Sequence, residues 1–72
     1  MEWNRRRDLE GGKELGIWIN NDGRELYVEG LTYRGDGYSV YIYNPETDAW
    51  DQRLSTEDRE EAFKTAVKIT RS

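Results

Sequence analysis

The stretch GIWINNDGRELYV, residues 16–28, decides the fold. It places two runs of alternating apolar residues on either side of Asp22-Gly23. Asp-Gly is a strong signal for a two-residue β-hairpin loop, because both loop positions need a positive φ that these residues tolerate. A turn centred there predicts three cross-strand pairs: Ile19 with Leu26 and Ile17 with Val28 on one face, and Trp18 with Tyr27 on the other. A turn one residue earlier would mix apolar and charged residues on one face, so we prefer the first register.

The next stretch, LTYRGDGYSVYI at residues 31–42, contains a second such turn at Asp36-Gly37. It predicts the inward pairs Tyr33 with Val40 and Leu31 with Ile42, and the outward pairs Thr32 with Tyr41 and Arg34 with Ser39. Along the strand between the two turns, the inward residues Leu26 and Val28 have even numbers whereas Leu31 and Tyr33 have odd numbers. They share a face only if the chain bulges at Glu29-Gly30. We therefore expect one long, kinked strand over residues 24–34.

The same stretch contains Arg34-Gly35-Asp36, a tripeptide associated with docking on cell-surface receptors. A three-residue match is weak support for a function, and the turn chemistry of Asp36-Gly37 accounts for the same residues. We therefore do not expect receptor binding through Arg34-Gly35-Asp36.

The C-terminal half predicts one more strand and a helix. Asn44-Pro45-Glu46-Thr47 is typical of a type I turn, and a short strand over residues 50–54 should follow. A three-residue loop would direct Trp50 inward opposite Ile42, whereas a four-residue loop would put it beside Tyr43 on the outer face; we prefer the inward placement. Ser55-Thr56 should then open a helix with acidic residues in its first turns and basic residues later. Its apolar stripe consists of Phe63, Ala66, Val67 and Thr70, widened by Ala62 and Ile69.

These elements predict an α+β fold: a four-stranded antiparallel meander (ββββα) with one C-terminal helix packed on one face of the sheet. Residues 1–15 show no periodicity, so we expect a flexible N-terminal arm, followed by a single small domain over residues 16–72. The expected core consists of Ile17, Ile19, Leu26, Val28, Leu31, Tyr33, Tyr38, Val40, Ile42, Trp50, Leu54, Phe63, Ala66 and Val67. One helix covers only one face, so the other face should be open.

The composition limits the function classes. The chain has 72 residues, neither Cys nor His, and a net charge of −4. Without these residues the usual thiol nucleophiles, proton shuttles and zinc ligands are missing, so we expect no enzyme activity, no cofactor and no metal site. No apolar run approaches the roughly 20 residues that span a membrane, and no signal-peptide core follows Met1. With the lack of Cys, this favours a cytoplasmic location. An acidic chain with few lysines is also typical of salt-loving organisms.

The open face of the sheet is the candidate binding surface. Tyr, Trp and Arg are enriched at the centres of protein interfaces, and the predicted registers place such residues on this face. The candidate contact residues are Trp18, Tyr27, Arg34, Tyr41, Tyr43 and Arg53. Aromatic cross-strand pairs can equally do no more than stabilise a small sheet. We expect a non-catalytic module that binds a protein partner, or a second copy of itself as a homodimer, through this face.

Nucleic acid is the alternative partner. Aromatic side chains on an open sheet can stack on unpaired bases, and an N-terminal arm with Trp3, Arg5, Arg6 and Arg7 could hold phosphates. The net negative charge of the chain opposes phosphate binding, as do the acidic residues expected on the same face: Glu25, Glu29 and Asp51.

Residues 31–69, with YRG, the alternating YSVYI, a short strand and TEDREEAFKTA, resemble the plant ethylene-response-factor DNA-binding domain. The plan of three strands and then a helix is also similar to the arm-binding domains of phage-type integrases. The resemblance implies that the open sheet enters the DNA major groove, with Arg34, Tyr41 and Arg53 as the counterparts of the contact residues.

Overall fold

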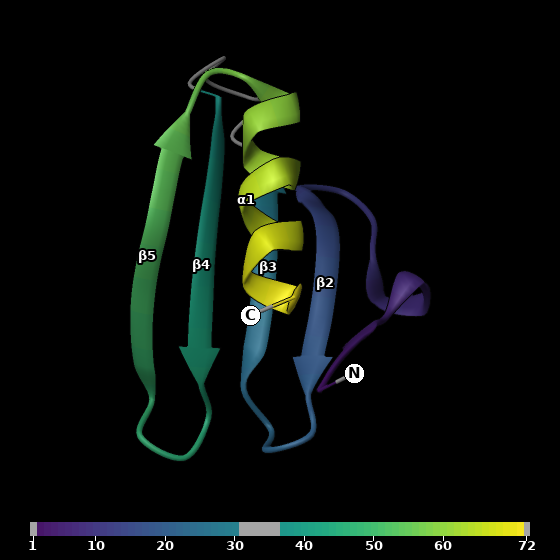
Figure 1. Cartoon of the computed structure of the whole chain (residues 1–72), viewed down its shortest axis with the longest axis vertical. Helices are drawn as coiled ribbons and strands as arrows, with labels where there is room; N and C mark the ends of the chain where they lie inside the picture. The colour runs from purple at the N-terminus through teal and green to yellow at the C-terminus, as the bar shows by residue number, and fades with distance from the viewer. Residues whose placement is uncertain (1, 31–36, 72) are drawn as a thin grey trace.

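The computed structural model describes residues 2–30 and 37–71 and shows an antiparallel sheet with a helix on one side (Figure 1). Within these residues the sheet has five strands in the order β1-β2-β3-β4-β5. The elements are β1 (Trp3–Arg5), the 3₁₀ helix η1 (Arg7–Leu9), β2 (Glu14–Asn20), β3 (Glu25–Gly30), β4 (Tyr38–Asn44), β5 (Ala49–Thr56) and α1 (Arg59–Arg71). Helix α1 lies in front of β3, between β2 and β4, and β5 forms an outer edge of the sheet (Figure 1).

The prediction of four strands is wrong, because residues 3–5 add a fifth strand in the segment that we expected to be a flexible arm. Trp3 pairs with Asn20, and Arg5 pairs with Trp18. The Trp3 side chain is only 6% exposed and belongs to the core cluster. The burial of this large aromatic side chain stabilises the pairing of β1 with β2. A three-residue strand is too short to show a period in the sequence.

The register of the first hairpin differs from the prediction by one residue. The N–H of Asn20 donates to the carbonyl of Arg24 at 2.8 Å, which closes a three-residue loop, and Gly23 takes the positive φ (98°) within it. Asp-Gly suits this loop as well as the two-residue loop. A shift of one residue exchanges the faces of a strand. Trp18 therefore pairs with Leu26 on the side of α1, and Ile17 pairs with Tyr27 on the other side.

The second predicted hairpin register is also wrong. Val40 pairs with Val28 and Ile42 pairs with Leu26, so residues 25–29 of β3 pair with both β2 and β4. β3 keeps one alternation through Gly30 and shows no bulge at Glu29-Gly30. Residues 31–36, which include the predicted core residues Leu31 and Tyr33 and the tripeptide Arg34-Gly35-Asp36, lie outside the described residues.

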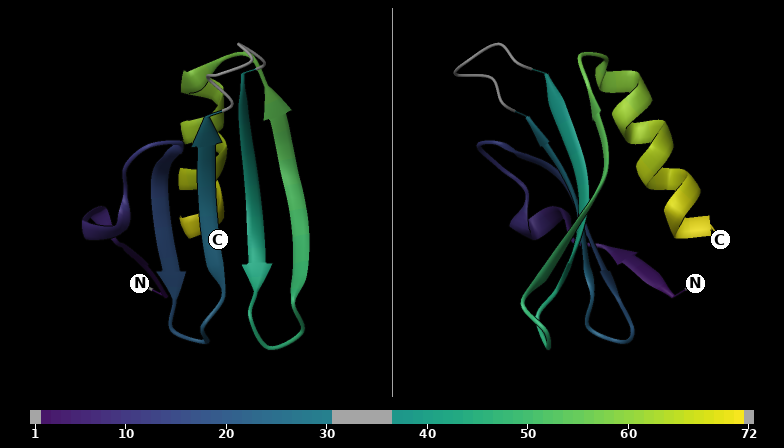
Figure 2. Two further views of the ribbon diagram at one scale, coloured as in Figure 1. Left: turned by 180° about the vertical axis from the view of Figure 1, so that it is seen from behind. Right: turned by 90° about the vertical axis from the view of Figure 1, so that its left-hand side faces the viewer.

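Helix α1 begins later than predicted, and it turns the predicted stripe to the sheet except for Val67. Asp58 caps it: its carboxylate accepts the N–H of Glu60 at 2.9 Å. The buried residues of α1 are Ala62, Ala66 and Thr70, whereas Val67 of the predicted stripe is 36% exposed. Two alanines at this spacing let the helix approach the sheet closely, since neither needs room for a long side chain. Figure 2 shows that α1 covers only one side of the sheet.

The core cluster lies between α1 and the strands. Of the predicted core residues, Leu26, Val28, Val40, Ile42 and Ala66 are buried there, and Tyr38, Leu54 and Phe63 pack against them. Trp3 and Trp18 are also buried in it, although we did not expect them, and so is Ala62 from the edge of the predicted helix stripe. Ile17 is buried as predicted but outside this cluster, on the other face of the sheet.

A side-chain carboxylate, that of Glu10, takes the place of a backbone carbonyl in pairing the N-terminal segment with β2. Beyond Arg6, the carboxylate of Glu10 accepts the backbone N–H of Ile17 at 3.0 Å. The same carboxylate accepts the guanidinium of Arg5 through two bonds, from Nε at 2.8 Å and from Nη2 at 3.0 Å. The guanidinium also lies 4.8 Å from the ring centre of Trp18. Glu10 and Arg5 therefore join β1, the start of β2 and the core.

Candidate functional site

The face of the sheet away from α1 carries a row of aromatic side chains across three strands. We call it the aromatic strip, and it consists of Tyr27 on β3, Tyr41 and Tyr43 on β4, and Trp50 on β5. The rings of Tyr27 and Tyr41 are stacked, with centres 5.2 Å apart and planes 15° apart. The indole of Trp50 lies 5.1 Å from the ring centre of Tyr41 and 4.2 Å from that of Tyr43. The four rings therefore form one continuous surface.

Trp50 occupies the outer face, so our preferred inward placement is wrong. Asn44 pairs with Ala49, which leaves a four-residue loop and places Trp50 opposite Tyr43. The Trp50 side chain is 61% exposed. An irregularity opposite Val40 and Tyr41 adds one residue to β5, so Leu54 still faces the core. This bulge lets one short strand direct an indole outward and a leucine inward.

Each tyrosine of the strip donates its hydroxyl hydrogen bond to a carboxylate. Tyr27 donates to Glu25 at 2.7 Å, Tyr41 to Glu29 at 2.8 Å and Tyr43 to Asp48 at 2.8 Å. These bonds fix the direction of the rings and leave acceptor positions on each carboxylate. The strip is therefore an ordered aromatic surface with negative charge along it.

The environment raises the pKa of all three hydroxyls. Partial burial and the hydrogen bond to Glu25 raise the pKa of Tyr27 to about 12. Partial burial and the bond to Glu29 raise the pKa of Tyr41 as well. For Tyr43 the bond to Asp48 is the main cause of a raised pKa. At neutral pH the three hydroxyls are donors, and the surrounding charges that act on them are carboxylates.

The structure brings together only part of the predicted sheet-face set. Tyr27, Tyr41 and Tyr43 lie in the strip as expected. Trp18 lies on the opposite face, where its ring makes an edge contact with Phe63 at 6.4 Å. Arg53 forms an ion pair with Asp51 at 2.8 Å rather than a contact with the strip, and Arg34 lies outside the described residues. Trp50 belongs to the strip, but we predicted that it faces the core. The alternative four-residue loop, which we did not prefer, would have placed it on the outer face.

The predicted arm residues do not form an exposed basic cluster. Trp3 is buried, and Arg5 is paired with Glu10. Arg6 forms an exposed ion pair with Asp8 at 2.8 Å, and Arg7 begins η1. Acidic neighbours therefore neutralise two of the three arginines.

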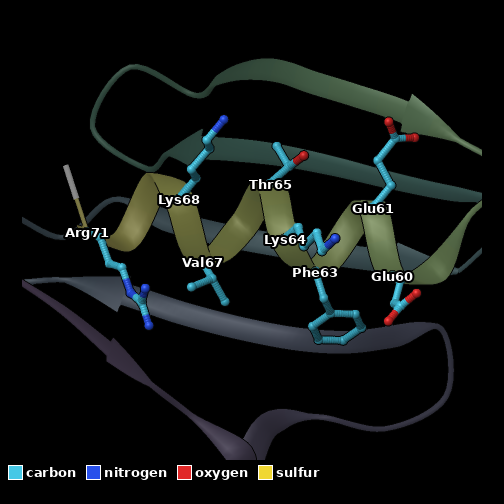
Figure 3. Close-up of a pocket in the computed structure, with 8 residues that line it drawn as sticks. All are labelled: Glu60, Glu61, Phe63, Lys64, Thr65, Val67, Lys68 and Arg71. Carbon is cyan, nitrogen blue, oxygen red and sulfur yellow. The ribbon is translucent and has the colours of Figure 1, made fainter.

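A shallow hollow on α1 is a second surface feature (Figure 3). It is lined by Glu60, Glu61, Phe63, Lys64, Thr65, Val67, Lys68 and Arg71. All of these come from one helix, and they carry charges of both signs, so they define no particular ligand. In the described part of the chain, no three or more His, Cys, Asp or Glu residues are grouped to hold a metal ion, and no described helix is long and apolar enough to cross a membrane.

None of the protein-family models, curated proteins or solved structures compared with this chain matches it.

Proposed function

We propose that this chain is a non-catalytic interaction module that binds a protein partner through the aromatic strip. The observation that carries the proposal is the exposed indole of Trp50, which is continuous with three tyrosine rings on the face of the sheet that α1 leaves uncovered. Trp and Tyr are the residues that most often dominate protein interfaces. Sheet stabilisation alone gives roughly 0.2–1 kcal/mol per cross-strand pair and does not require a largely exposed indole.

The charges of the strip favour a different protein over a second copy of this chain. Two copies that met through their strips would bring Glu25, Glu29 and Asp48 of one chain close to the same carboxylates of the other. Like charges across an interface cost several kcal/mol when they are not compensated. The same carboxylates repel the phosphates of nucleic acid, and two of the three arginines of the N-terminal segment are already paired. A protein partner is therefore the function that the geometry supports best.

Selection of random peptides displayed on phage tests the proposal. Clones that bind the immobilised chain should lose about thirtyfold or more in affinity for Trp50→Ala, since a central interface Trp contributes about 2 kcal/mol or more. Leu9→Ala is the matched control, because Leu9 is a large apolar residue, 50% exposed, that belongs to η1 and not to the strip. Circular dichroism verifies that both variants are folded. Clones that bind Trp50→Ala as tightly as the unmodified chain would refute the proposal.

A further inference from the structure

We propose that the aromatic strip recognises arginine side chains in an extended segment of the partner. This inference rests on the proposed function and specifies the chemistry of the partner. The strip combines two features that each attract a guanidinium group. Aromatic faces attract cations, Trp most strongly, and carboxylates accept the parallel N–H groups of arginine.

The face of the strip carries a further carboxylate, Glu14, in addition to the three that accept the tyrosine hydroxyls. Glu14 and Glu29 stand directly opposite each other across β2 and β3. Glu29 lies on the face of the strip because its carboxylate accepts the hydroxyl of Tyr41, and Glu14 shares that face because directly opposed residues of an antiparallel pair point to the same side. Like charges at directly opposed positions destabilise a sheet. A bound cation would relieve this repulsion.

The four ion-paired arginines of the described chain, Arg5, Arg6, Arg24 and Arg53, pair with acids outside the strip. Within residues 2–30 and 37–71 the ion pairs use Glu10, Asp8, Asp22 and Asp51 as their acids. None of these pairs uses Glu14, Glu25, Glu29 or Asp48, the carboxylates near the strip. The strip therefore presents rings and uncompensated negative charge together, which complements a basic segment.

The molecule already contains one example of this chemistry. In the core-side cluster, the guanidinium of Arg5 lies 4.8 Å from the ring centre of Trp18 and forms two hydrogen bonds to Glu10. At the strip, Trp50 supplies the exposed ring, and Asp48 and Glu25 supply the carboxylates on either side of Tyr43. The planar guanidinium can stack and donate at once, whereas the ammonium group of lysine cannot, so we expect arginine to be preferred to lysine.

Fluorescence anisotropy with defined peptides tests the inference. The probe is a labelled peptide of about ten residues in which Arg alternates with Ser, so that its arginines share one side of an extended chain. Matched peptides carry Lys, Gln or Glu in place of Arg, and labelled duplex DNA is a further probe. We expect the Arg peptide to bind most tightly and the Gln peptide at least about tenfold more weakly, one factor of ten being 1.4 kcal/mol.

Two double variants separate recognition at the strip from general attraction to an acidic protein. Glu25→Gln with Glu29→Gln removes two charges at the strip, and Glu57→Gln with Glu60→Gln removes two exposed charges around the start of α1. Both change the net charge equally. We expect the first to weaken the Arg peptide about tenfold and the second less than about twofold, because charges beyond a Debye length of ~8–10 Å are screened.

The outcomes distinguish the two proposals. Equal binding of the Gln and Arg peptides, or equal weakening by both double variants, would overturn arginine recognition. Tighter binding of duplex DNA through the same residues would overturn it too, as would self-association that Trp50→Ala abolishes. If displayed peptides depend on Trp50 but carry no enrichment in arginine, the proposed function stands and this inference fails. If no peptide of either kind depends on Trp50, both fail.

Discussion

Replacement of Glu10 by Gln should strongly destabilise the fold, because one carboxylate joins three parts of the chain. It accepts two hydrogen bonds from Arg5 and one from the N–H of Ile17. Its side chain is 14% exposed and that of Arg5 is 28% exposed, so solvent screens the pair only partly. An amide keeps one acceptor oxygen, loses the bond to Nη2 and turns an NH₂ group toward the guanidinium.

The magnitude follows from the bonds that are lost or weakened. A hydrogen bond to a charged group contributes about 1.5–3 kcal/mol and a neutral one about 0.5–1.5 kcal/mol. One charged bond is lost, the bond from Nε loses the charge of its acceptor, and the bond from Ile17 becomes neutral. After allowance for partial exposure we expect a loss of about 2–3 kcal/mol. For a domain of this size that lowers Tm by about 8–20 °C. Urea unfolding followed by Trp fluorescence measures the loss, since Trp18 lies beside Arg5.

The effect should depend on pH. The hydrogen bonds from Arg5 hold the pKa of Glu10 below its ordinary value of 4.5, against the opposing effect of burial. The unfolded chain therefore takes up this proton at a higher pH than the folded chain does. The stabilisation from Glu10 is complete well above pH 4.5 and is lost as the pH falls through the lowered pKa. The difference between the unmodified chain and Glu10→Gln should thus be largest near neutral pH and shrink in acid.

Asp8→Asn is the control, because its ion pair with Arg6 is exposed, at 63% for Asp8 and 43% for Arg6. We expect it to change stability far less than Glu10→Gln does, because solvent screens an exposed pair. If Glu10→Gln changes stability as little as Asp8→Asn, with the same pH dependence as the unmodified chain, the stabilising role assigned to the Glu10 carboxylate is refuted.

Three further predictions concern the backbone, the core and the strip. Gly37→Ala should lower the stability measured by urea unfolding more than Gly23→Ala does. Both glycines have φ near +98°, but a Cβ at Gly37 would lie 2.4 Å from the Thr56 carbonyl oxygen, whereas one at Gly23 meets nothing within 4 Å. Equal losses would contradict this packing. Ala66→Leu should lose about 1–3 kcal/mol by overpacking, because Ala66 is fully buried against the sheet, and an unchanged midpoint would show that the helix has room there. The pKa of Tyr27 is higher in the folded chain, so its stabilisation is present below pH 10.0 and lost toward about pH 12. Tyr27→Phe should reduce this loss of stability in unfolding curves measured at alkaline pH. An unchanged dependence of stability on pH would exclude Tyr27 as its source.

The alternation within single strands predicted much of the fold. Leu26, Val28, Val40 and Ile42 face the core as expected, and Tyr27 faces outward, because period-two patterns depend only on the strand itself. The helix at the C-terminus was also predicted, although it begins after Asp58.

The errors arose where pairing depended on loop length. Asp-Gly suits both two- and three-residue loops, and the choice exchanged the faces of Trp18 and Ile17. The four-residue loop before β5 likewise decided the face of Trp50. β1 could not be predicted, since the burial of Trp3 depends on contacts with residues distant in sequence. The predicted aromatic face is therefore the face opposite α1, with Trp50 in the place that we expected for Trp18.

The most direct test of the central claim uses the three indole N–H signals of the chain in a ¹⁵N NMR spectrum. Trp3 and Trp18 are each 6% exposed on the core side, whereas Trp50 is 61% exposed in the strip. On addition of the Arg-bearing peptide, we predict that the Trp50 signal shifts progressively to saturation while the Trp3 and Trp18 signals stay in place. Saturable binding of this peptide that leaves the Trp50 signal unmoved would contradict the account.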